Sequence, residues 1–276
     1  MSYVGITADQ ERGYYDEIYA GHLALPDHSL RVDRRILLAD LNDPSKAIYE
    51  RRKLFRLVFA CLERQPLSEL AVLDYGCGPG DWGVWMATEG ARVTFLDLSP
   101  VAIELALRRV KASGASDRVK GEARDASDLS CFRTGQFDIV FACAALHHTL
   151  KYPNALEELL RVLKPGGRLV LAETLGNNPV LNLARRVMAR RIGEPEEAGE
   201  GILFSQREID LLRPHFRKIE VTPVNLLAMS KRLLRGHFTN PAARGLLRTL
   251  EALDSALLLL PFLRRYCGEA LIVAEK

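Results

Sequence analysis

The stretch VLDYGCGPGDWG, residues 72–83, decides the fold of this chain. An apolar run typical of a strand includes an acid, Asp74, near its end, and the chain then passes through four glycines and a proline. A glycine-rich turn between a strand and a helix lets the backbone come close to a ligand and points N–H groups at it. The stretch therefore predicts a ligand-binding turn that follows a strand of an α/β sheet.

Two cofactors are compatible with this turn. Gly78, Gly80 and Gly83 form the G-x-G-x-x-G pattern of dinucleotide-binding proteins. The overlapping D-x-G-x-G-x-G pattern, which starts at Asp74 and adds Gly76, is associated with S-adenosylmethionine (SAM). A pyrophosphate and an amino-acid carboxylate are both anions, so the glycines do not discriminate between them. Asp74 favours SAM, because a carboxylate suits a methionine ammonium and is unfavourable beside a pyrophosphate.

Strand-like and helix-like segments alternate from residue 71 onwards. Short apolar runs predict strands at residues 71–75, 92–98, 117–126, 137–146, 168–174, 217–224 and 268–276. Helical patterns lie between them at about 82–89, 100–113 and 154–164. The second of these begins with a serine cap, Ser99, and a proline at the first helical position. This alternation predicts a parallel α/β sheet with helices on both faces.

Three segments lie outside the alternation: residues 1–70, 176–205 and 225–266. The last is too long for a plain loop in a compact domain, and it contains helix-like runs. We expect these segments to form a mostly helical substrate cap over the carboxyl ends of the strands, where ligands bind in open α/β sheets. The chain then divides into an N-terminal cap segment, 1–70, and a core, 71–276, that carries the other two segments as insertions.

Composition and charge argue against several classes of protein. The net charge of +3 on 276 residues is too mild for a nucleic-acid-binding protein. The five cysteines are scattered and never form C-x-x-C, which argues against a disulfide framework or a zinc site. The polar N-terminus lacks a signal-peptide core, and the longest apolar stretch, 256–263, is too short to span a bilayer. We therefore expect a cytoplasmic protein with no metal and no transmembrane segment.

Two further acids follow predicted strands. Asp97 closes the second strand, where a carboxylate can accept hydrogen bonds from both hydroxyls of a ribose. Asp125 follows the third strand, where its carboxylate could accept a hydrogen bond from an adenine amino group. Both positions suit an adenosine-containing cofactor.

With these residues, the chain resembles a class I SAM-dependent methyltransferase of the small-molecule type. The resemblance rests on five segments in order over about residues 71–175, namely VLDYGCGPG, TFLDLSP, GEARDASDL, FDIVFACAALHHT and LLRVLKPGGRLVLAE. It implies a Rossmann-like seven-stranded sheet of order 3-2-1-4-5-7-6 with strand seven antiparallel. It also implies SAM as the cofactor and S-adenosylhomocysteine (SAH) as the product.

The resemblance implies a set of cofactor-binding residues by their positions in the motifs. The glycine-rich segment would surround the methionine part of SAM, the end of strand two would hold the ribose and the adenine, and the pair after strand three would flank the adenine. The end of strand four would line the methionine side through its backbone, and N-terminal tyrosines would close over SAM. In this order the residues are Asp74, Gly76, Gly78 and Gly80; Asp97 and Leu98; Asp125 and Ala126; Ala142; and Tyr14 and Tyr19.

Three residues are candidates for a general base. His147 and His148 follow the fourth strand, where the methyl group and the acceptor should meet, and histidine titrates near neutrality. Glu173 closes the fifth strand at the same cleft. Each has a structural alternative, because a histidine here can shape the pocket or cap a helix, and Glu173 can hold the following loop. The adjacent histidines lack a carboxylate at helical spacing, which argues against a metal site.

The cap segments bear on the acceptor. Residues 179–193 form an amphipathic pattern. Its apolar face would comprise Val180, Leu183, Ala184, Val187 and Met188, and its other side Arg185, Arg186, Arg190 and Arg191. We expect the arginines to form a solvated face rather than a contact with an anionic membrane. We expect the leucine-rich stretch 246–263 to belong to the hydrophobic core of the cap. The less favoured alternatives are the lining of an acceptor pocket and a dimer contact.

These features favour a hydrophobic or aromatic metabolite as the acceptor and a monomer or homodimer as the enzyme. The resemblance implies oxygen as the commonest methyl acceptor, with nitrogen, carbon and sulfur acceptors still open. Two rivals remain. An NAD(P)-dependent oxidoreductase would use the G-x-G-x-x-G pattern, but it leaves Asp74 and the LHH and LKPGG segments unexplained. A non-catalytic SAM-binding partner subunit would not need the intact motif set or a cap of this size.

Overall fold

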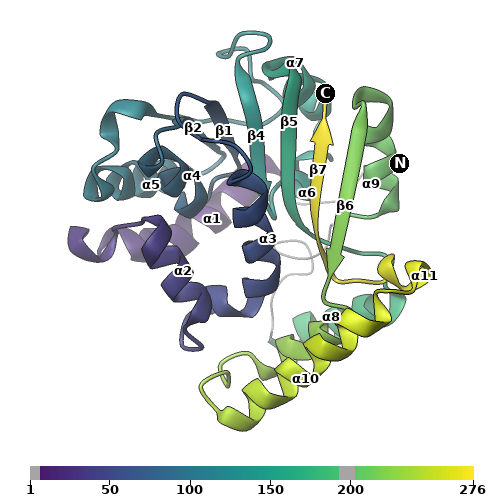
Figure 1. Cartoon of the computed structure of the whole chain (residues 1–276). Helices are drawn as coiled ribbons and strands as arrows, with labels where there is room; N and C mark the ends of the chain where they lie inside the picture. The colour runs from purple at the N-terminus through teal and green to yellow at the C-terminus, as the bar shows by residue number, and fades with distance from the viewer. Residues whose placement is uncertain (1–6, 193–202) are drawn as a thin grey trace.

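The computed structural model describes residues 7–192 and 203–276, which form a seven-stranded sheet with helices on both faces (Figure 1). The strand order is β3-β2-β1-β4-β5-β7-β6. β7 runs antiparallel to β5 and β6, and the other neighbours are parallel. The strands are β1 (Ala71–Tyr75), β2 (Arg92–Asp97), β3 (Val119–Ala123), β4 (Phe137–Cys143), β5 (Leu163–Thr174), β6 (Lys218–Val224) and β7 (Glu269–Glu275). The predicted fold class and strand order are confirmed.

The helices follow the predicted alternation within the core and add others in the cap segments. The α-helices are α1 (Ala8–Leu23), α2 (Arg34–Asn42), α3 (Arg52–Leu62), α4 (Asp81–Thr88), α5 (Pro100–Ser113), α6 (Leu146–Thr149), α7 (Ala155–Val162), α8 (Pro179–Ile192), α9 (Gln206–Leu212), α10 (Pro241–Leu257) and α11 (Pro261–Arg264). Short 3₁₀ helices lie at η1 (Asp27–Ser29), η2 (Ala47–Arg51), η3 (Ser116–Arg118), η4 (Arg213–His215) and η5 (Leu227–Leu234).

Successive residues of each central strand point to opposite faces, and both faces are buried. In β1, Val72 joins a core with α3 and α4, whereas Leu73 joins a second core with α7 and α9. In β4, Phe141 joins the first of these cores and Val140 joins the second. The continuous apolar runs in the sequence are explained by this double burial.

The start of α5 forms as its sequence predicts. The Ser99 hydroxyl accepts a hydrogen bond from the N–H of Ala102 at 3.0 Å, and Pro100 occupies the first turn. The helix ends at Gly114, which has φ +74°. The end of α7 differs slightly from the prediction, because Leu163 pairs with Phe137 and opens β5 ahead of the expected glycine turn.

The structure reverses the expected orientation of α8. Val180, Leu183 and Val187 are exposed, whereas Arg185 is buried and donates to the Leu175 carbonyl at 2.9 Å. The amphipathic pattern identified the helix but assigned its faces wrongly, because a backbone carbonyl at the end of β5 binds the guanidinium. The side chains of Arg186, Met188, Arg190 and Arg191 lie outside the described residues.

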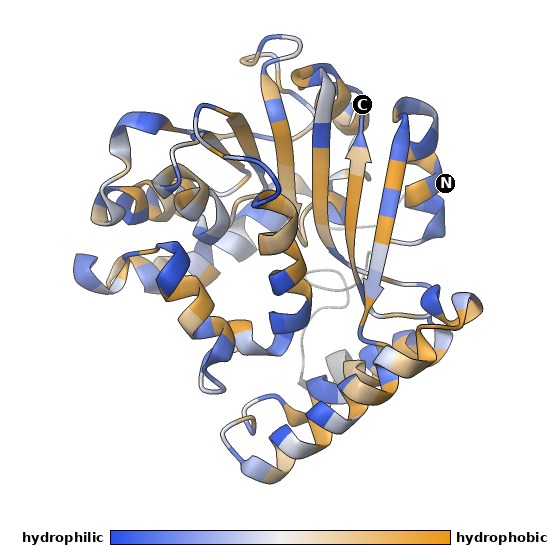
Figure 2. Cartoon of the chain, viewed as in Figure 1, coloured by the Kyte–Doolittle hydropathy of each residue, from blue (hydrophilic) through white to orange (hydrophobic). Residues whose placement is uncertain are grey.

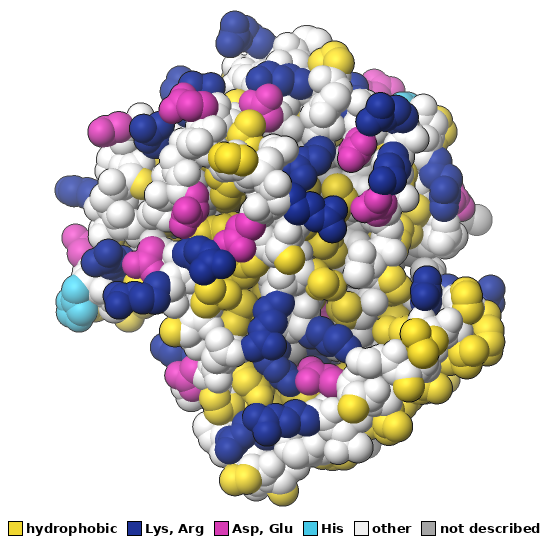
Figure 3. Space-filling model, in the orientation of Figure 1, with side chains coloured by type: hydrophobic (Ala, Val, Ile, Leu, Met, Phe, Trp, Pro, Cys, Tyr) yellow, Lys and Arg dark blue, Asp and Glu magenta, His cyan; other side chains and the backbone are white. Residues whose placement is uncertain are grey.

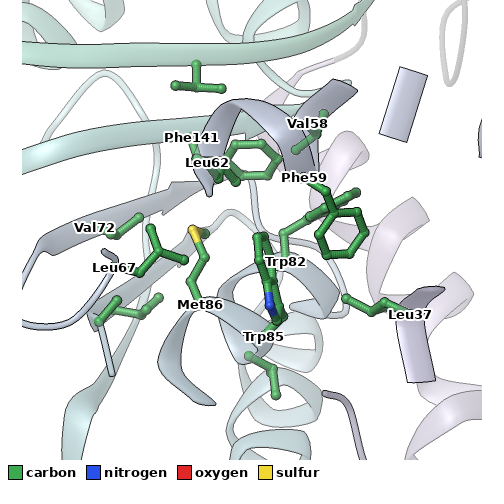
Figure 4. Packing of buried hydrophobic residues seen from close by; sticks show 14 of the residues in the cluster. Leu37, Val58, Phe59, Leu62, Leu67, Val72, Trp82, Trp85, Met86 and Phe141 are labelled. Atoms are coloured by element: carbon green, nitrogen blue, oxygen red, sulfur yellow. The ribbon is translucent and has the colours of Figure 1, made fainter. Parts of the chain in front are cut away.

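Helix α4 packs against α3 through aromatic side chains (Figure 4). The rings of Trp82 and Trp85 lie 5.0 and 4.5 Å from that of Phe59. On its other side α4 approaches β2 so closely that a Cβ at Gly83 would lie 2.2 Å from Phe95 Cε1 and 2.5 Å from Asp74 Oδ2. The last glycine of the opening motif therefore serves helix–strand packing.

Replacing Gly83 with alanine is expected to lower the free energy of unfolding by roughly 1–3 kcal/mol, because the added methyl overpacks the contact with β2. Chemical denaturation measures this change. The matched control is Gly245→Ala, since a Cβ there meets nothing within 4 Å. In the interior of α10 this control should stabilise by roughly 0.5–1 kcal/mol. Equal stability of Gly83→Ala and wild type would contradict the packing role.

Candidate active site

A pocket of about 660 Å³, partly open to solvent, lies at the carboxyl ends of β1 and β2 under helix α1. It contains most of the residues that the resemblance implied for the cofactor. Those that line it are Tyr19, Gly76, Gly78, Asp97, Leu98, Asp125 and Ala126. Residues from three distant parts of the sequence therefore meet at the edge of the sheet where open α/β folds bind ligands.

The glycine turn forms one wall of this pocket. The N–H groups of Gly76 and Cys77 both donate to the Leu96 carbonyl, at 2.8 and 3.0 Å, which fixes the turn against β2. Gly76 and Gly78 have φ values of +65° and +51°. A Cβ at Gly76 would lie 2.4 Å from that of Ala145, so a side chain does not fit. The bare backbone is thus required for the shape of the wall.

The carboxylate of Asp97 belongs to a residue that lines the pocket at the end of β2. Its two oxygens accept hydrogen bonds from the N–H groups of Gly78 and Ser99, at 2.8 and 2.9 Å. Burial raises the pKa of Asp97 despite these bonds, and no cation pairs with it in the described chain. A carboxylate has about four lone-pair sites. Asp97 therefore retains acceptor capacity toward the pocket, which fits a pair of ribose hydroxyls.

Three residues of the motifs are absent from the lining that the structure describes. Asp74 is buried, accepts from the Gly83 N–H at 3.0 Å and has a pKa raised well above its ordinary value by burial. Gly80, at φ +78°, begins α4. Ala142 is buried in β4. Their contacts with SAM remain predictions, and the described contacts of Asp74 and Gly80 position the start of α4.

Helix α1 covers the pocket with a face that the sequence analysis identified only in part. Tyr19 lines the pocket as predicted, but its partner there is Tyr15 and not Tyr14. The rings of Tyr15 and Tyr19 stack at 6.1 Å. Glu11, Tyr15 and Tyr19 are spaced by four residues and all line the pocket. This helical spacing was visible in the sequence and could have identified all three.

Glu11 is a site residue that the sequence analysis missed. Its carboxylate lies 3.1 Å from His148 Nδ1 and 3.0 Å from Lys151 Nζ, and it accepts a hydrogen bond from the Tyr152 hydroxyl. Burial favours the neutral acid, but hydrogen bonds from His148, Tyr152 and Lys151 outweigh it and lower the pKa of Glu11 to about 2. Glu11 is therefore ionised at neutral pH.

The two adjacent histidines have different surroundings. His147 is buried, and its Nδ1 lies 2.6 Å from Glu173 Oε2. The other oxygen of Glu173 accepts from the Leu146 N–H at 3.1 Å. His147 and Glu173 thus hold the turn after β4, which corresponds to the structural alternative for both. His148 lines the pocket, and burial lowers its pKa despite the hydrogen bond to Glu11.

Comparisons with known proteins agree with this geometry. Residues 72–167 match the family described as "Methyltransferase domain". The ubiquinone biosynthesis O-methyltransferase of Xanthomonas oryzae pv. oryzae is 33% identical over 156 residues, which make up 55% of this chain and 63% of that protein. Residues 72–167 thus carry a methyltransferase domain, and the chain is similar to SAM-dependent methyltransferases as the sequence motifs implied. This similarity, together with the glycine turn and Asp97, favours SAM over a nicotinamide as the cofactor.

Solved structures share the fold of this chain. The phosphoethanolamine N-methyltransferase 2 of Haemonchus contortus in complex with SAM has a TM-score of 0.53 and 21% identity, covering 79% of this chain and 51% of that one. The [4+2]-cyclase SpnF has a TM-score of 0.54 and 24% identity, with 80% of each chain covered. The chain spans about half the length of the curated relatives that it matches.

Residues 7–192 and 203–276 contain no group of three or more His, Cys, Asp or Glu side chains placed to hold a metal ion. Over the same described residues, no helix is long and apolar enough to cross a membrane.

Proposed function

We propose that the protein transfers the methyl group of SAM to an oxygen of a hydrophobic or aromatic small molecule and releases SAH. The observation that carries the proposal is the Asp97 carboxylate, which retains acceptor capacity in a pocket that also contains the glycine turn and His148. The similarity to the ubiquinone biosynthesis O-methyltransferase supports oxygen as the acceptor atom.

Different residues of the pocket would bind different parts of the cofactor. Asp97 would accept from the ribose hydroxyls, and Leu98, Asp125 and Ala126 would flank the adenine. The backbone of the glycine turn would hold the amino-acid part. SAM, when bound, supplies a methyl group already activated on a sulfonium. Tyr15 and Tyr19 of α1 would exclude water from it, and exclusion of water strengthens every electrostatic contact inside.

His148 is the group that would take the proton of the acceptor hydroxyl. Its Nδ1 faces the ionised carboxylate of Glu11, so this nitrogen carries the hydrogen and Nε2 keeps its lone pair. Burial lowers the pKa of His148, so the ring is neutral at neutral pH and able to accept a proton at Nε2. Glu11 then acts as a positioning residue, since it fixes the tautomer and would stabilise the imidazolium that forms.

Incubation with SAM that carries a deuterated methyl group tests the proposal. The acceptor panel contains phenols and catechols with and without alkyl tails, together with matched amines and thiols. We expect SAH and a product with one deuterated methyl on oxygen, detected by mass spectrometry, with the alkylated phenols preferred. Tight SAM binding without SAH release from any acceptor would overturn the proposal and favour a non-catalytic SAM-binding subunit.

A further inference from the structure

Helix α10 has a buried apolar stripe with exposed leucines beside it. Leu247, Leu250 and Leu258, just past its end, face inward and pack against buried residues of the cap and of the sheet. A second apolar row continues into α11 and faces outward. It comprises Leu246, Leu253, Leu259, Leu260 and Phe262, which we call the α10–α11 apolar face. Leu259 is 75% and Phe262 63% exposed. Large apolar side chains that are grouped and exposed in this way mark an interaction site.

Within residues 241–266, the charged side chains that do not point into the protein are all arginines. Residues 241–266 contain four arginines and two acidic residues, Glu251 and Asp254. Both acids point into the protein, since Glu251 pairs with Arg52 at 2.7 Å and Asp254 accepts from three backbone N–H groups just after β6. Arg264 donates to a backbone carbonyl and Arg265 to the Tyr266 hydroxyl, so no carboxylate of the described chain neutralises either guanidinium.

The space-filling view shows the same combination, with apolar side chains gathered over α10 and α11 and basic side chains next to them (Figure 3). The hydropathy colouring shows hydrophobic residues interspersed with hydrophilic ones along α10 and α11 (Figure 2). The start of α8 lies beside this segment, because Asn178 Nδ2 donates to the Tyr266 carbonyl at 2.9 Å. Val180 and Leu183 add exposed apolar area there.

We propose that the α10–α11 apolar face docks on the surface of an anionic lipid bilayer, with its leucines and Phe262 among the acyl chains and its arginines at the headgroups. An exposed apolar row with arginines and no outward acid is the pattern of an interfacial helix. A second copy of the chain is a poorer occupant. A two-fold contact through this face would bring the arginines of both copies together without acidic partners from the segment.

The docking face lies at the same edge of the sheet as the SAM pocket. Asp254 of α10 contacts the backbone directly after β6, and β6 runs parallel to the strands whose carboxyl ends form the pocket. A docked protein would therefore present its cap and its pocket edge toward the membrane. Uptake of a lipophilic acceptor from the bilayer rests on the proposed function, whereas the docking itself does not.

Vesicle flotation with the full chain tests the proposal, in the absence of any acceptor. The vesicles are of phosphatidylcholine alone or of an equimolar mixture of phosphatidylcholine and phosphatidylglycerol. The wild type is expected to float with the mixed vesicles, and high salt should release it. Arg264→Ser combined with Arg265→Ser should lower the partition constant by at least about tenfold. Leu259→Ser combined with Phe262→Ser should lower it by roughly tenfold or more.

The matched control is Arg207→Ser combined with Leu211→Ser on α9, which removes one exposed arginine and one exposed leucine elsewhere on the surface. It should bind vesicles as the wild type does. SAM binding by calorimetry verifies that each variant is folded.

The proposal is overturned if the wild type does not bind mixed vesicles, or if the α9 control weakens binding as much as the α10–α11 variants. A wild-type dimer that Phe262→Ser converts to a monomer, without vesicle binding, would also overturn it and assign the face to a second copy. Methyl transfer in solution without vesicle binding would contradict the docking proposal and leave the proposed function intact.

Discussion

Replacing Asp97 with alanine is expected to abolish detectable SAM binding while the fold remains intact. The carboxylate is the charged acceptor in the pocket that suits two ribose hydroxyls, and hydrogen bonds to charged groups contribute about 1.5–3 kcal/mol each. Losing two of them weakens binding by roughly 10²–10⁴-fold. Burial raises the pKa of Asp97, so ionisation of this carboxyl opposes folding rather than stabilising the fold. Calorimetric titration with SAM and with SAH measures the effect.

The control for this variant is Asp128→Ala. Asp128 is also an acid, and it stands in the loop after β3, but its side chain is exposed and does not line the pocket. Its removal should leave the affinity for SAM unchanged. Asp97→Asn provides an intermediate case, because one amide oxygen still accepts while the charge is lost. An unchanged SAM affinity in Asp97→Ala would contradict the location of the cofactor site, and the acceptor proposal would fail with it.

The features of the fold that could be predicted from sequence are those that a few neighbouring residues determine. Ser99 and Pro100 start α5, and Gly76 and Gly78 adopt positive φ values where the chain must turn. Asp97 closes a strand whose burial on both faces shows directly as an apolar run. Parallel neighbours end at one edge of the sheet, so their terminal residues were expected to meet at one site.

The remaining features depend on contacts between segments far apart in the sequence. Nothing near Glu11 in the sequence indicates that it meets His148, because that contact depends on how α1 lies across the sheet. Arg185 is buried because the carbonyl of Leu175, just after β5, accepts a hydrogen bond from its guanidinium. The periodicity of residues within α8 cannot reveal this contact. The two histidines are adjacent in sequence and chemically identical, so their roles could be separated only by the partners that the fold supplies.

His148→Ala is expected to lower turnover by about 10²–10⁴-fold, the usual contribution of a general base, while SAM affinity changes little. His148 lines the pocket and keeps Nε2 free, whereas His147 is bonded to the buried Glu173. The matched control is His147→Gln, whose side-chain amide can still donate to Glu173. It should keep turnover near the wild-type value. Single-turnover measurements with saturating SAM and acceptor separate the chemical step from binding.

The pH dependence of turnover gives a second readout of the same assignment. His148 must be neutral to accept a proton, so activity is lost as the pH falls through its pKa. Burial lowers that pKa, which places the acid limb of the profile below the ordinary histidine value of 6.5. Glu11 acts in the opposite direction and raises the pKa of His148, so Glu11→Gln should move the acid limb to still lower pH. The maximal turnover of this variant should also be lower, because the ring of His148 is no longer held in one tautomer.

These outcomes discriminate between a base and a residue that only shapes the pocket. A purely structural His148 would leave the acid limb of the profile in place when Glu11 is changed, and His148→Ala would raise the KM for the acceptor without lowering kcat. If His147→Gln instead caused the larger loss of turnover, the buried pair with Glu173 would have to open during catalysis to expose His147. The base would then be His147, and α1 would act only in closing the pocket over SAM.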